Sequence, residues 1–295
     1  MSLKEIYLTG FADEAAPGID DQIRITKKLG WSNIEARNID GVNIHDLPEE
    51  KFDEVAGKLE DAGVQVNCFG SGIANWGTKL DDPFEDTLEK VNRAIPRMRR
   101  LGSKLIRIMS FAFPGEGEDL REEERFARLR EITDMFSDAG IVPVHENCMN
   151  YGGLSYEHTL NMIENVPGLK LVFDTGNPVF NKDFSKPKPR PYQSSWEFYS
   201  HVKEHVAYIH IKDARMGDDG KEIYTWPGEG DGDVIPILKD LIGGGYQGGI
   251  SIEPHLAVVF HAEDDGKPDL KKCEESYVEY GQRLMGILDG IRSEL

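Results

Sequence analysis

Short hydrophobic segments and longer amphipathic segments alternate along this chain. Hydrophobic segments rich in aliphatic and β-branched residues lie near positions 5–10, 33–37, 64–69, 105–110, 141–146, 170–174, 207–212 and 249–253. Amphipathic segments follow them at 20–29, 48–62, 83–101, 120–139, 155–165, 194–206, 234–242 and 272–292. The first pattern predicts buried strands, and the second predicts helices that each bury one face.

Eight strand-and-helix units in one chain favour a (β/α)8 TIM barrel, an α/β fold. An open doubly wound sheet fits less well, because no Gly-x-Gly-x-x-Gly sequence follows the first predicted strand. The length of 295 residues suits one barrel, which typically needs about 250 residues. No composition shift marks a boundary, so we predict a single domain over 1–295.

Loop lengths separate the two ends of the predicted barrel. Several predicted helices are followed at once by a glycine suited to a left-handed C-cap, at Gly30, Gly63, Gly102 and Gly140. Longer connections follow the strands, at 70–82, 111–119, 178–193, 213–233 and 254–270. Barrel enzymes build their active sites from the loops after strands, so we expect the site at that end.

Four predicted strands end at or beside a side chain that can bind a metal. These side chains are Glu146, Asp174, His210 and Glu253. One such residue alone would more often be a capping or solvated group, but four in register predict a shared ion. Three carboxylates and one imidazole favour Mn²⁺, Mg²⁺ or Co²⁺, and Zn²⁺ stays open.

Strand alternation predicts which neighbours share the pocket. Side chains two residues apart point to the same face, so Lys212 should accompany His210, and His255 should accompany Glu253. We expect His255 to contact substrate or to support the ligands. His145 should point away from the pocket, as a hydrogen-bonded structural histidine.

The predicted ligands also suggest a reaction. A divalent cation chelated by a hydroxy-ketone stabilises an enediolate and eases removal of the neighbouring proton. Glu146 and Glu253 come from separated strands and could shuttle that proton from two sides. Lys212 could stabilise the oxyanion, or it could be a salt-bridge partner of these acids.

Charge restricts the partners. The chain has 34 lysines and arginines against 53 aspartates and glutamates, a formal net charge of −19. Such a field repels nucleic acid and anionic membranes, so we expect neither as a partner. The acid-rich final loops also disfavour a phosphate, so we expect an unphosphorylated sugar or keto-sugar.

Cysteine usage and hydropathy favour a cytoplasmic protein. Cys68, Cys148 and Cys273 are widely spaced and odd in number, unlike a disulfide framework or a zinc ribbon. The sequence shows no leader and no apolar run of about 20 residues, so we expect neither export nor membrane insertion.

Side chains in or near the predicted rim could line a sugar pocket. Aromatic faces could stack on a sugar ring, and polar groups could bind hydroxyls or a carboxylate. The aromatic candidates are Phe11, Trp76, Phe111 and Trp226, and the polar candidates are Arg37, Arg107, Asn177, Lys212 and His255.

Short motifs recur in a family-like order over nearly the whole chain. They are Phe11-Ala-Asp-Glu14, Glu35-Ala-Arg37, Asp40-Gly-Val-Asn43, His145-Glu-Asn147, Asp174-Thr-Gly-Asn-Pro178, His210-Ile-Lys-Asp213, Pro227-Gly-Glu-Gly230 and Ser251-Ile-Glu-Pro-His255. The chain thereby resembles the xylose isomerase-like TIM-barrel superfamily, particularly its sugar isomerase/epimerase branch. The resemblance implies that Glu146, Asp174, His210 and Glu253 bind one divalent metal, with the two glutamates as acid and base.

One position departs from this resemblance. Ketose 3-epimerases of the branch usually carry histidine three residues after the metal-binding aspartate, where this chain has Asn177. The superfamily also contains an inosose dehydratase, hydroxypyruvate isomerases, keto-sugar lyases and three-zinc DNA-repair endonucleases. An endonuclease would need more histidines and a basic face. Asn177 is not a histidine, and the 228–233 loop is acidic, so neither need is met.

These observations leave three main hypotheses. The first is a metal-dependent isomerase or epimerase of a sugar, polyol ketone or keto-sugar. The second is a dehydratase or lyase of a keto-sugar or inosose that uses the same metal site, and the third is a non-catalytic sugar-binding barrel. A homo-oligomer is also open, because the Pro-rich stretch 186–191 could be a lid, an oligomer contact or a surface loop.

Overall fold

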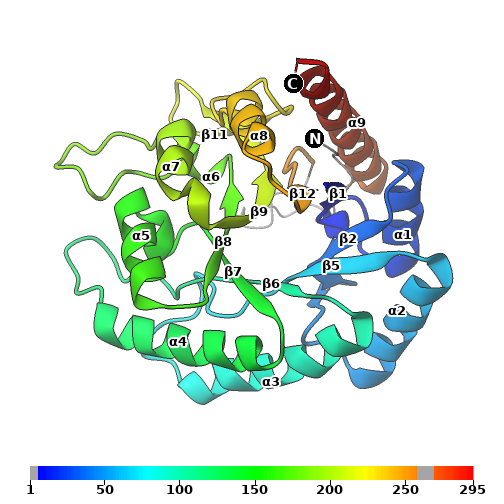
Figure 1. The fold of residues 1–295 in the computed structure, drawn as a ribbon, viewed down its shortest axis with the longest axis horizontal. Coiled ribbons are helices and arrows are strands. Elements are labelled where there is room, and N and C mark those ends of the chain that lie inside the picture. The colour runs from blue at the N-terminus through cyan, green and yellow to red at the C-terminus, as the bar shows by residue number, and fades with distance from the viewer. Residues whose placement is uncertain (1–5, 258–268, 295) are drawn as a thin grey trace.

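The computed structural model describes residues 6–257 and 269–294 and contains a parallel eight-stranded sheet rolled into a barrel (Figure 1). Its strands are β1 Tyr7–Gly10, β2 Asn33–Ala36, β5 Gln65–Gly70, β6 Leu105–Ile108, β7 Val142–Glu146, β8 Lys170–Asp174, β9 Val206–Ile211 and β12 Gly249–Ile252. The hydrogen-bonded order is β1-β12-β9-β8-β7-β6-β5-β2. A parallel bridge between Phe11 and Glu35 brings the ends of β1 and β2 together. The predicted TIM barrel is therefore confirmed.

The helices surround the strands (Figure 1). They are α1 Ile19–Lys28, α2 Glu49–Ala62, α3 Phe84–Leu101, α4 Glu122–Asp138, α5 Tyr156–Asn165, α6 Asn177–Phe180, α7 Ser195–Val202, α8 Val234–Gly243 and α9 Leu270–Glu294. The sequence pattern predicted all of these but the short α6, and it carried α7 four residues too far because the chain turns there into a 3-10 helix, Lys203–His205. No described helix has the length and apolar character needed to cross a bilayer.

The glycines after four helices adopt the predicted left-handed backbone. Gly30, Gly63, Gly102 and Gly140 have φ angles of 76°, 64°, 70° and 73°. A residue with a Cβ adopts this region at a cost, and glycine does not. These turns keep the connections short at the amino ends of the strands, and the described long loops lie at the opposite end. Residues 258–268 of the predicted loop 254–270 lie outside the described residues.

The barrel interior is layered, and the layers position the site. A buried cluster of Cys68, Val144, Val172 and Tyr208 fills the interior. Because alternate residues of a strand share a face, the residues two positions further along β7, β8 and β9 point into the next layer. Those residues are Glu146, Asp174 and His210. The apolar layer thus forms a dry floor beneath the polar layer.

The loop after β9 contains a hairpin that the sequence pattern did not predict. Strands β10 Asp213–Met216 and β11 Glu222–Thr225 pair antiparallel, and β3 Asn38–Ile39 pairs in the same way with β4 Val42–Asn43. Both hairpins are short and partly exposed, so neither leaves a clear period of apolar residues.

A single buried carboxylate anchors the acidic, glycine-rich loop that follows this hairpin. Asp213 accepts hydrogen bonds from the backbone N–H groups of Ala214, Gly228, Gly230 and Gly232 at 2.9, 2.7, 3.0 and 2.9 Å. A Cβ at Gly230 would lie 2.4 Å from the Asp213 Oδ1 atom. The glycines therefore allow the loop to wrap closely around this carboxylate.

We expect Asp213→Ala to lower the free energy of unfolding by about 2–4 kcal/mol, because a buried amide left without a partner costs roughly 1–3 kcal/mol. Urea unfolding would measure the change from the transition midpoint. Asp219→Ala is the matched control, since Asp219 lies in the exposed hairpin turn, and its effect should stay below about 1 kcal/mol. Equal midpoints for the two variants would contradict an anchoring role for Asp213.

Candidate metal centre

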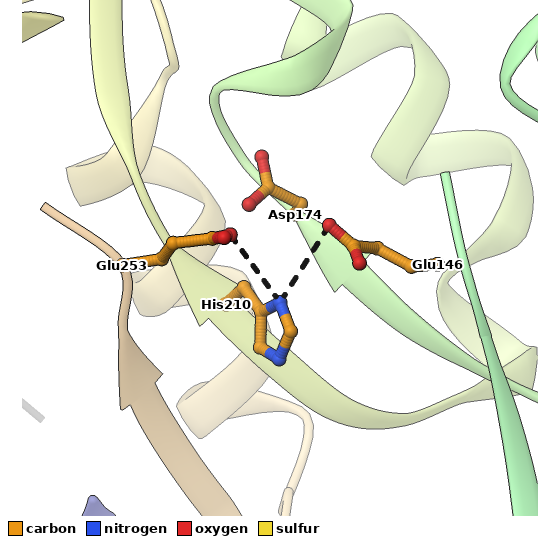
Figure 2. Close-up of side chains that lie close together, drawn as sticks. All are labelled: Glu146, Asp174, His210 and Glu253. Atoms are coloured by element: carbon orange, nitrogen blue, oxygen red, sulfur yellow. Dashed lines mark ion pairs between the residues drawn. The ribbon is translucent and has the colours of Figure 1, made fainter. Parts of the chain in front are cut away.

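The four side chains predicted as ligands meet at the carboxyl ends of their strands (Figure 2). Glu146, Asp174, His210 and Glu253 each offer a ligand atom within 4.8 Å of the others, and all four side chains are buried. Figure 2 shows Glu146 and Glu253 reaching toward each other from opposite sides, with His210 below and Asp174 between them. The geometry therefore brings together residues separated by up to 107 positions in the sequence (253 − 146).

The imidazole of His210 is aimed into the carboxylates. Its Nδ1 atom lies 3.8 Å from Glu146 Oε1 and 3.8 Å from Glu253 Oε2. Among the described residues this nitrogen has no hydrogen-bond partner, although it is fully buried. A buried nitrogen without a partner is costly, and a bound cation would satisfy it. The donor set and this orphaned atom both fit a divalent metal ion.

Glu35, on β2, holds the other side of the His210 ring. The carboxylate lies 3.0 Å from His210 Nε2, and it accepts hydrogen bonds from the Tyr208 hydroxyl at 2.9 Å and the Ser251 hydroxyl at 2.6 Å. Placing the ring proton on Nε2, against this carboxylate, leaves the Nδ1 lone pair facing the acids. This hydrogen-bond network favours the proton on Nε2.

Glu35 is a supporting residue that the site prediction omitted. The sequence contained it only as part of the Glu35-Ala-Arg37 motif, with no sign that it would meet a residue 175 positions away. Strand alternation puts Glu35 on the same face as Arg37, which was a candidate pocket residue. That alternation is the signal that could have found it.

Surrounding charge decides the protonation of His210. Burial alone would lower the pKa of this histidine, but the charges of Glu35 and Glu146 outweigh burial and raise the pKa to about 10. The cluster therefore attracts positive charge at the centre of the four side chains. A divalent ion bound there would supply that charge and would compete with the proton.

Buried cations partner the carboxylates. Lys212 Nζ lies 3.2 Å from both Asp174 Oδ2 and Glu253 Oε2, so the salt-bridge interpretation of this lysine describes the geometry. Arg107 donates from Nη1 to Glu146 Oε2 at 2.9 Å, and Arg37 donates from Nη1 to Glu253 Oε1 at 3.0 Å. Each carboxylate of the cluster thus has a cationic neighbour.

These neighbours separate the pKa values of the acids. Burial would raise the pKa of Glu146, but Arg107 and His210 lower it to about 2. Burial raises the pKa of Asp174 to about 7, because Lys212 only partly offsets it and the two glutamates add to it. Glu253 stays well below its usual pKa against burial, through Lys212 and the cations around it. The two glutamates are therefore held as carboxylates.

His255 lies in the pocket, where its sequence position predicted it. Its Nδ1 atom is 3.0 Å from Glu14 Oε1, and its backbone N–H donates to Glu14 Oε2 at 2.8 Å. Its Nε2 atom is 3.6 Å from Glu253 Oε1, and the ring meets Tyr224 edge-on at 5.2 Å. The chain passes through a left-handed conformation here, with φ of 53°, so these contacts hold an unfavourable backbone shape.

A cavity of about 270 Å³ opens above the cluster. Its wall includes most of the predicted substrate contacts, namely Arg37, Trp76, Arg107, Asn177, Lys212 and His255, together with Glu146 and Glu253. Trp76 is 46% exposed. Asn177 donates from its amide to Glu146 Oε1 at 3.1 Å. We call this space the main cavity.

Other aromatic candidates lie outside the cavity wall. The Trp226 ring packs beside Tyr280, with the Arg283 guanidinium 4.4 Å from its centroid, so packing at the edge of the barrel occupies it. The expectation that Trp226 stacks on substrate is therefore not supported. Phe11 and Phe111 are fully buried and do not line the cavity.

The buried Phe11 ring instead supports the polar layer. The Arg37 and Arg107 guanidinium carbons lie 4.1 and 5.0 Å from its centroid, and His210 meets its edge at 5.0 Å. Cations are attracted to the face of an aromatic ring, so Phe11 helps to keep both arginines in place.

His145 points away from the metal cluster. Its Nε2 atom lies 3.0 Å from Ser110 Oγ and 3.0 Å from Asn150 Oδ1, and burial lowers its pKa to about 4. A Cβ at Gly152 would lie 2.3 Å from the ring, so glycine is needed there for close packing. These contacts are those of a neutral, hydrogen-bonded histidine in the packing layer.

Comparison with known proteins agrees with this architecture. No curated protein gives a significant sequence match. The structure is similar to a xylose isomerase-like TIM barrel protein from Mycobacterium smegmatis in complex with magnesium, with a TM-score of 0.68 and 18% identity over 96% of this chain and 97% of that one. It is also similar to a D-tagatose 3-epimerase-like protein, with a TM-score of 0.69 and 16% identity over 98% and 99% of the two chains.

A third similar structure is a probable 3-DHS dehydratase from Bacillus anthracis, with a TM-score of 0.66 and 14% identity over 95% of this chain and 98% of that one. At these identities the likeness shows a shared fold. The sequence itself goes further, because residues 23–275 match the family described as xylose isomerase-like TIM barrel. The resemblance in the motifs is thereby confirmed, and the chain belongs to the xylose isomerase-like TIM barrel family.

Proposed function

We propose that this protein is a divalent-metal-dependent isomerase or epimerase that acts on an unphosphorylated sugar or keto-sugar. One observation carries the proposal. Glu146 and Glu253 place carboxylate oxygens on opposite sides of the His210 Nδ1 atom, each 3.8 Å from it, and both residues line the main cavity. Two carboxylates that flank one substrate carbon can remove a proton from one face and return it to another.

We propose Glu146, Asp174, His210 and Glu253 as the ligands of one metal ion. The carboxylate-rich set favours Mn²⁺, Mg²⁺ or Co²⁺, and Zn²⁺ also accepts these ligands. When bound, the ion would polarise a substrate carbonyl and lower the cost of removing the neighbouring proton.

The protein groups around the ligands would perform the remaining steps. Either glutamate can take the proton from carbon, while Lys212 provides a buried positive charge for the oxyanion of the enediolate. Arg37 and Arg107 hold Glu253 and Glu146 in place through the hydrogen bonds described above. Burial of this layer keeps bulk water away from the proton being transferred.

The electrostatics of the cavity support a neutral substrate. Arg37, Arg107 and Lys212 each contact one or more carboxylates at 3.3 Å or less. A phosphate would have to compete with those carboxylates for the same cations. A sugar can instead use hydroxyls with the polar groups and a ring face against Trp76.

A dehydratase or lyase is the second candidate, because the same enediolate can expel a leaving group from the next carbon. The specific observation is Asn177, which donates to Glu146 where ketose 3-epimerases of the branch usually carry histidine. The solved structures of similar fold also include one described as epimerase-like and one described as a probable dehydratase. Incubation with keto-sugars and inososes separates the two: a lyase generates an unsaturated, ultraviolet-absorbing product, and an isomerase does not.

The first prediction concerns the ion itself. Metal-free protein titrated with Mn²⁺ in a calorimeter should bind one equivalent, and Asp174→Ala should weaken this binding by at least about 100-fold, since it removes a charged ligand. Asp183→Ala, at a buried aspartate outside the cluster, is the control and should bind as the wild type does. Unchanged affinity in Asp174→Ala would remove Asp174 from the ligand set.

The second prediction concerns the two glutamates. Glu146→Gln and Glu253→Gln should each lower turnover by about 10²–10⁴-fold, because an amide cannot accept the proton. Exchange of the substrate proton with deuterated solvent, followed by NMR, should fall with turnover. Wild-type exchange in both variants would rule out the two-carboxylate mechanism.

Lys212→Met should separate a charge effect from proton transfer. We expect turnover to fall by roughly 10²- to 10³-fold, as for other preorganised electrostatic groups, while slow deuterium exchange remains measurable. Complete loss of exchange in Lys212→Met, at full metal occupancy, would instead identify Lys212 as a base.

The fourth prediction concerns Glu35. Glu35→Gln should weaken Mn²⁺ binding by about 10- to 100-fold, because the amide no longer fixes the His210 ring as a carboxylate does. Tyr208→Phe is the matched control, since it removes another hydrogen bond to Glu35 but keeps the contact between Glu35 and His210. A larger loss of affinity in Tyr208→Phe than in Glu35→Gln would show that packing, and not the orientation of His210, is what matters.

A further inference from the structure

A second, smaller cavity adjoins the main cavity. It has a volume of about 170 Å³ and is lined by Phe113, Met149, Asn150, Gly153, Leu154, Asn181, Lys182 and Phe184. Met149 lines both cavities, so the two spaces meet at this side chain. Met149 is also 53% exposed, although its neighbour Cys148 is buried. We call this second space the side cavity.

The wall of the side cavity is mostly apolar, whereas the wall of the main cavity carries charged side chains. Phe113 and Phe184 meet edge to face at 5.0 Å, and Leu154 is buried beside them. The polar ends of two other wall residues are committed elsewhere. Asn150 Oδ1 contacts Ser110, His145 and the Gly152 N–H, and Lys182 Nζ lies 3.1 Å from the centroid of the Tyr192 ring.

Three rim loops hold this cavity in shape. The Phe184 backbone N–H donates to the Leu154 carbonyl at 2.9 Å, which joins the loop after β8 to the loop after β7. The Arg190 guanidinium covers the Phe184 ring at 4.7 Å and also pairs with Glu116, in the loop after β6. Lys188 pairs with the same carboxylate. The Pro-rich stretch 186–191 thus fastens the roof of the side cavity.

We propose that the side cavity binds an apolar substituent of the substrate, so that the substrate is a keto-sugar carrying an aryl or branched alkyl group. This inference rests on the proposed function, because it assumes that the sugar occupies the main cavity. A free sugar would bring hydroxyls to a wall that is mostly carbon, and hydroxyls placed there would lose hydrogen bonds to water. An aromatic ring would gain from leaving water.

Size and adaptability agree with this occupant. An engineered cavity of about 150 Å³ lined by Leu, Ile and Phe in another protein binds benzene, so a space of 170 Å³ can accept a phenyl ring. Met149 stands at the junction of the two cavities. Its unbranched thioether adapts to rings of different shape, and sulfur contacts with aromatic rings are favourable.

Calorimetric titration with matched ligands would test the proposal. The ligands are ketohexoses bearing one O-benzyl group at each hydroxyl in turn, each paired with its O-methyl counterpart, in the presence of Mn²⁺. For at least one position we expect the benzyl compound to bind roughly 10- to 100-fold more tightly than the methyl compound, from burial of the ring. Equal affinities within every pair would overturn the proposal.

Variants then locate the preference. Phe184→Ala and Phe113→Ser should each reduce the ratio of benzyl to methyl affinity at the favoured position by about tenfold. Trp196→Ala is the matched control, since it removes a partly exposed aromatic ring on α7, which lines neither cavity, and it should leave the ratio unchanged. A ratio that survives both side-cavity substitutions would also overturn the proposal.

The same ligands separate this inference from the proposed function. Turnover of the methyl compounds without any benzyl preference would support the isomerase or epimerase and reject the side-cavity proposal. A benzyl preference that depends on Phe184, without turnover of any compound, would support the side cavity and reject the proposed reaction.

Discussion

Three carboxylates buried within a few ångströms of one another repel strongly, and the arrangement of the site follows from the need to offset that repulsion. Glu146, Asp174 and Glu253 are buried at the carboxyl ends of β7, β8 and β12. Lys212 and two arginines contact them, and one imidazole nitrogen points among them. A concentrated negative field in a dry place is also what a divalent cation requires. The arrangement that allows these acids to stay buried in the folded chain therefore also suits them to hold a metal.

The barrel makes this concentration of charge possible. Alternation along each strand puts an apolar residue of the interior below a polar residue of the site, so Val144 lies beneath Glu146 and Val172 beneath Asp174. The lower layer excludes water, and the rigid strands fix the upper layer. Glu35 is positioned in the same way by a strand on the far side of the barrel, and its carboxylate orients the His210 ring. Positioning by strands is more precise than positioning by loops.

The loops at the carboxyl ends of the strands differ in character around the rim of the barrel. Asp213 holds the acidic loop after β9 in place, because its carboxylate accepts hydrogen bonds from the backbone N–H groups of the glycines in that loop. On the other side, the loops after β6, β7 and β8 enclose the apolar side cavity: Glu116 joins the loops after β6 and β8, and a backbone hydrogen bond joins the loops after β7 and β8. A charged main cavity beside a carbon-lined side cavity favours a substrate with two chemically distinct parts.

The sequence by itself determined the eight barrel strands, the long helices between them and the ligand candidates. Periods of two and of three to four residues fixed strands and helices to within a few positions, because burial on one face leaves that trace in any chain. Their positions at strand ends also identified Glu146, Asp174, His210 and Glu253 as candidate ligands, because all parallel strands of a barrel point the same way. Only the tertiary structure decided the rest. Glu35 meets His210 across the barrel, Trp226 packs beside Tyr280, and Met149 lines two cavities. Strand alternation could place Glu35 on the pocket face, but which distant residues meet depends on how the segments pack, and no local pattern of residues records that.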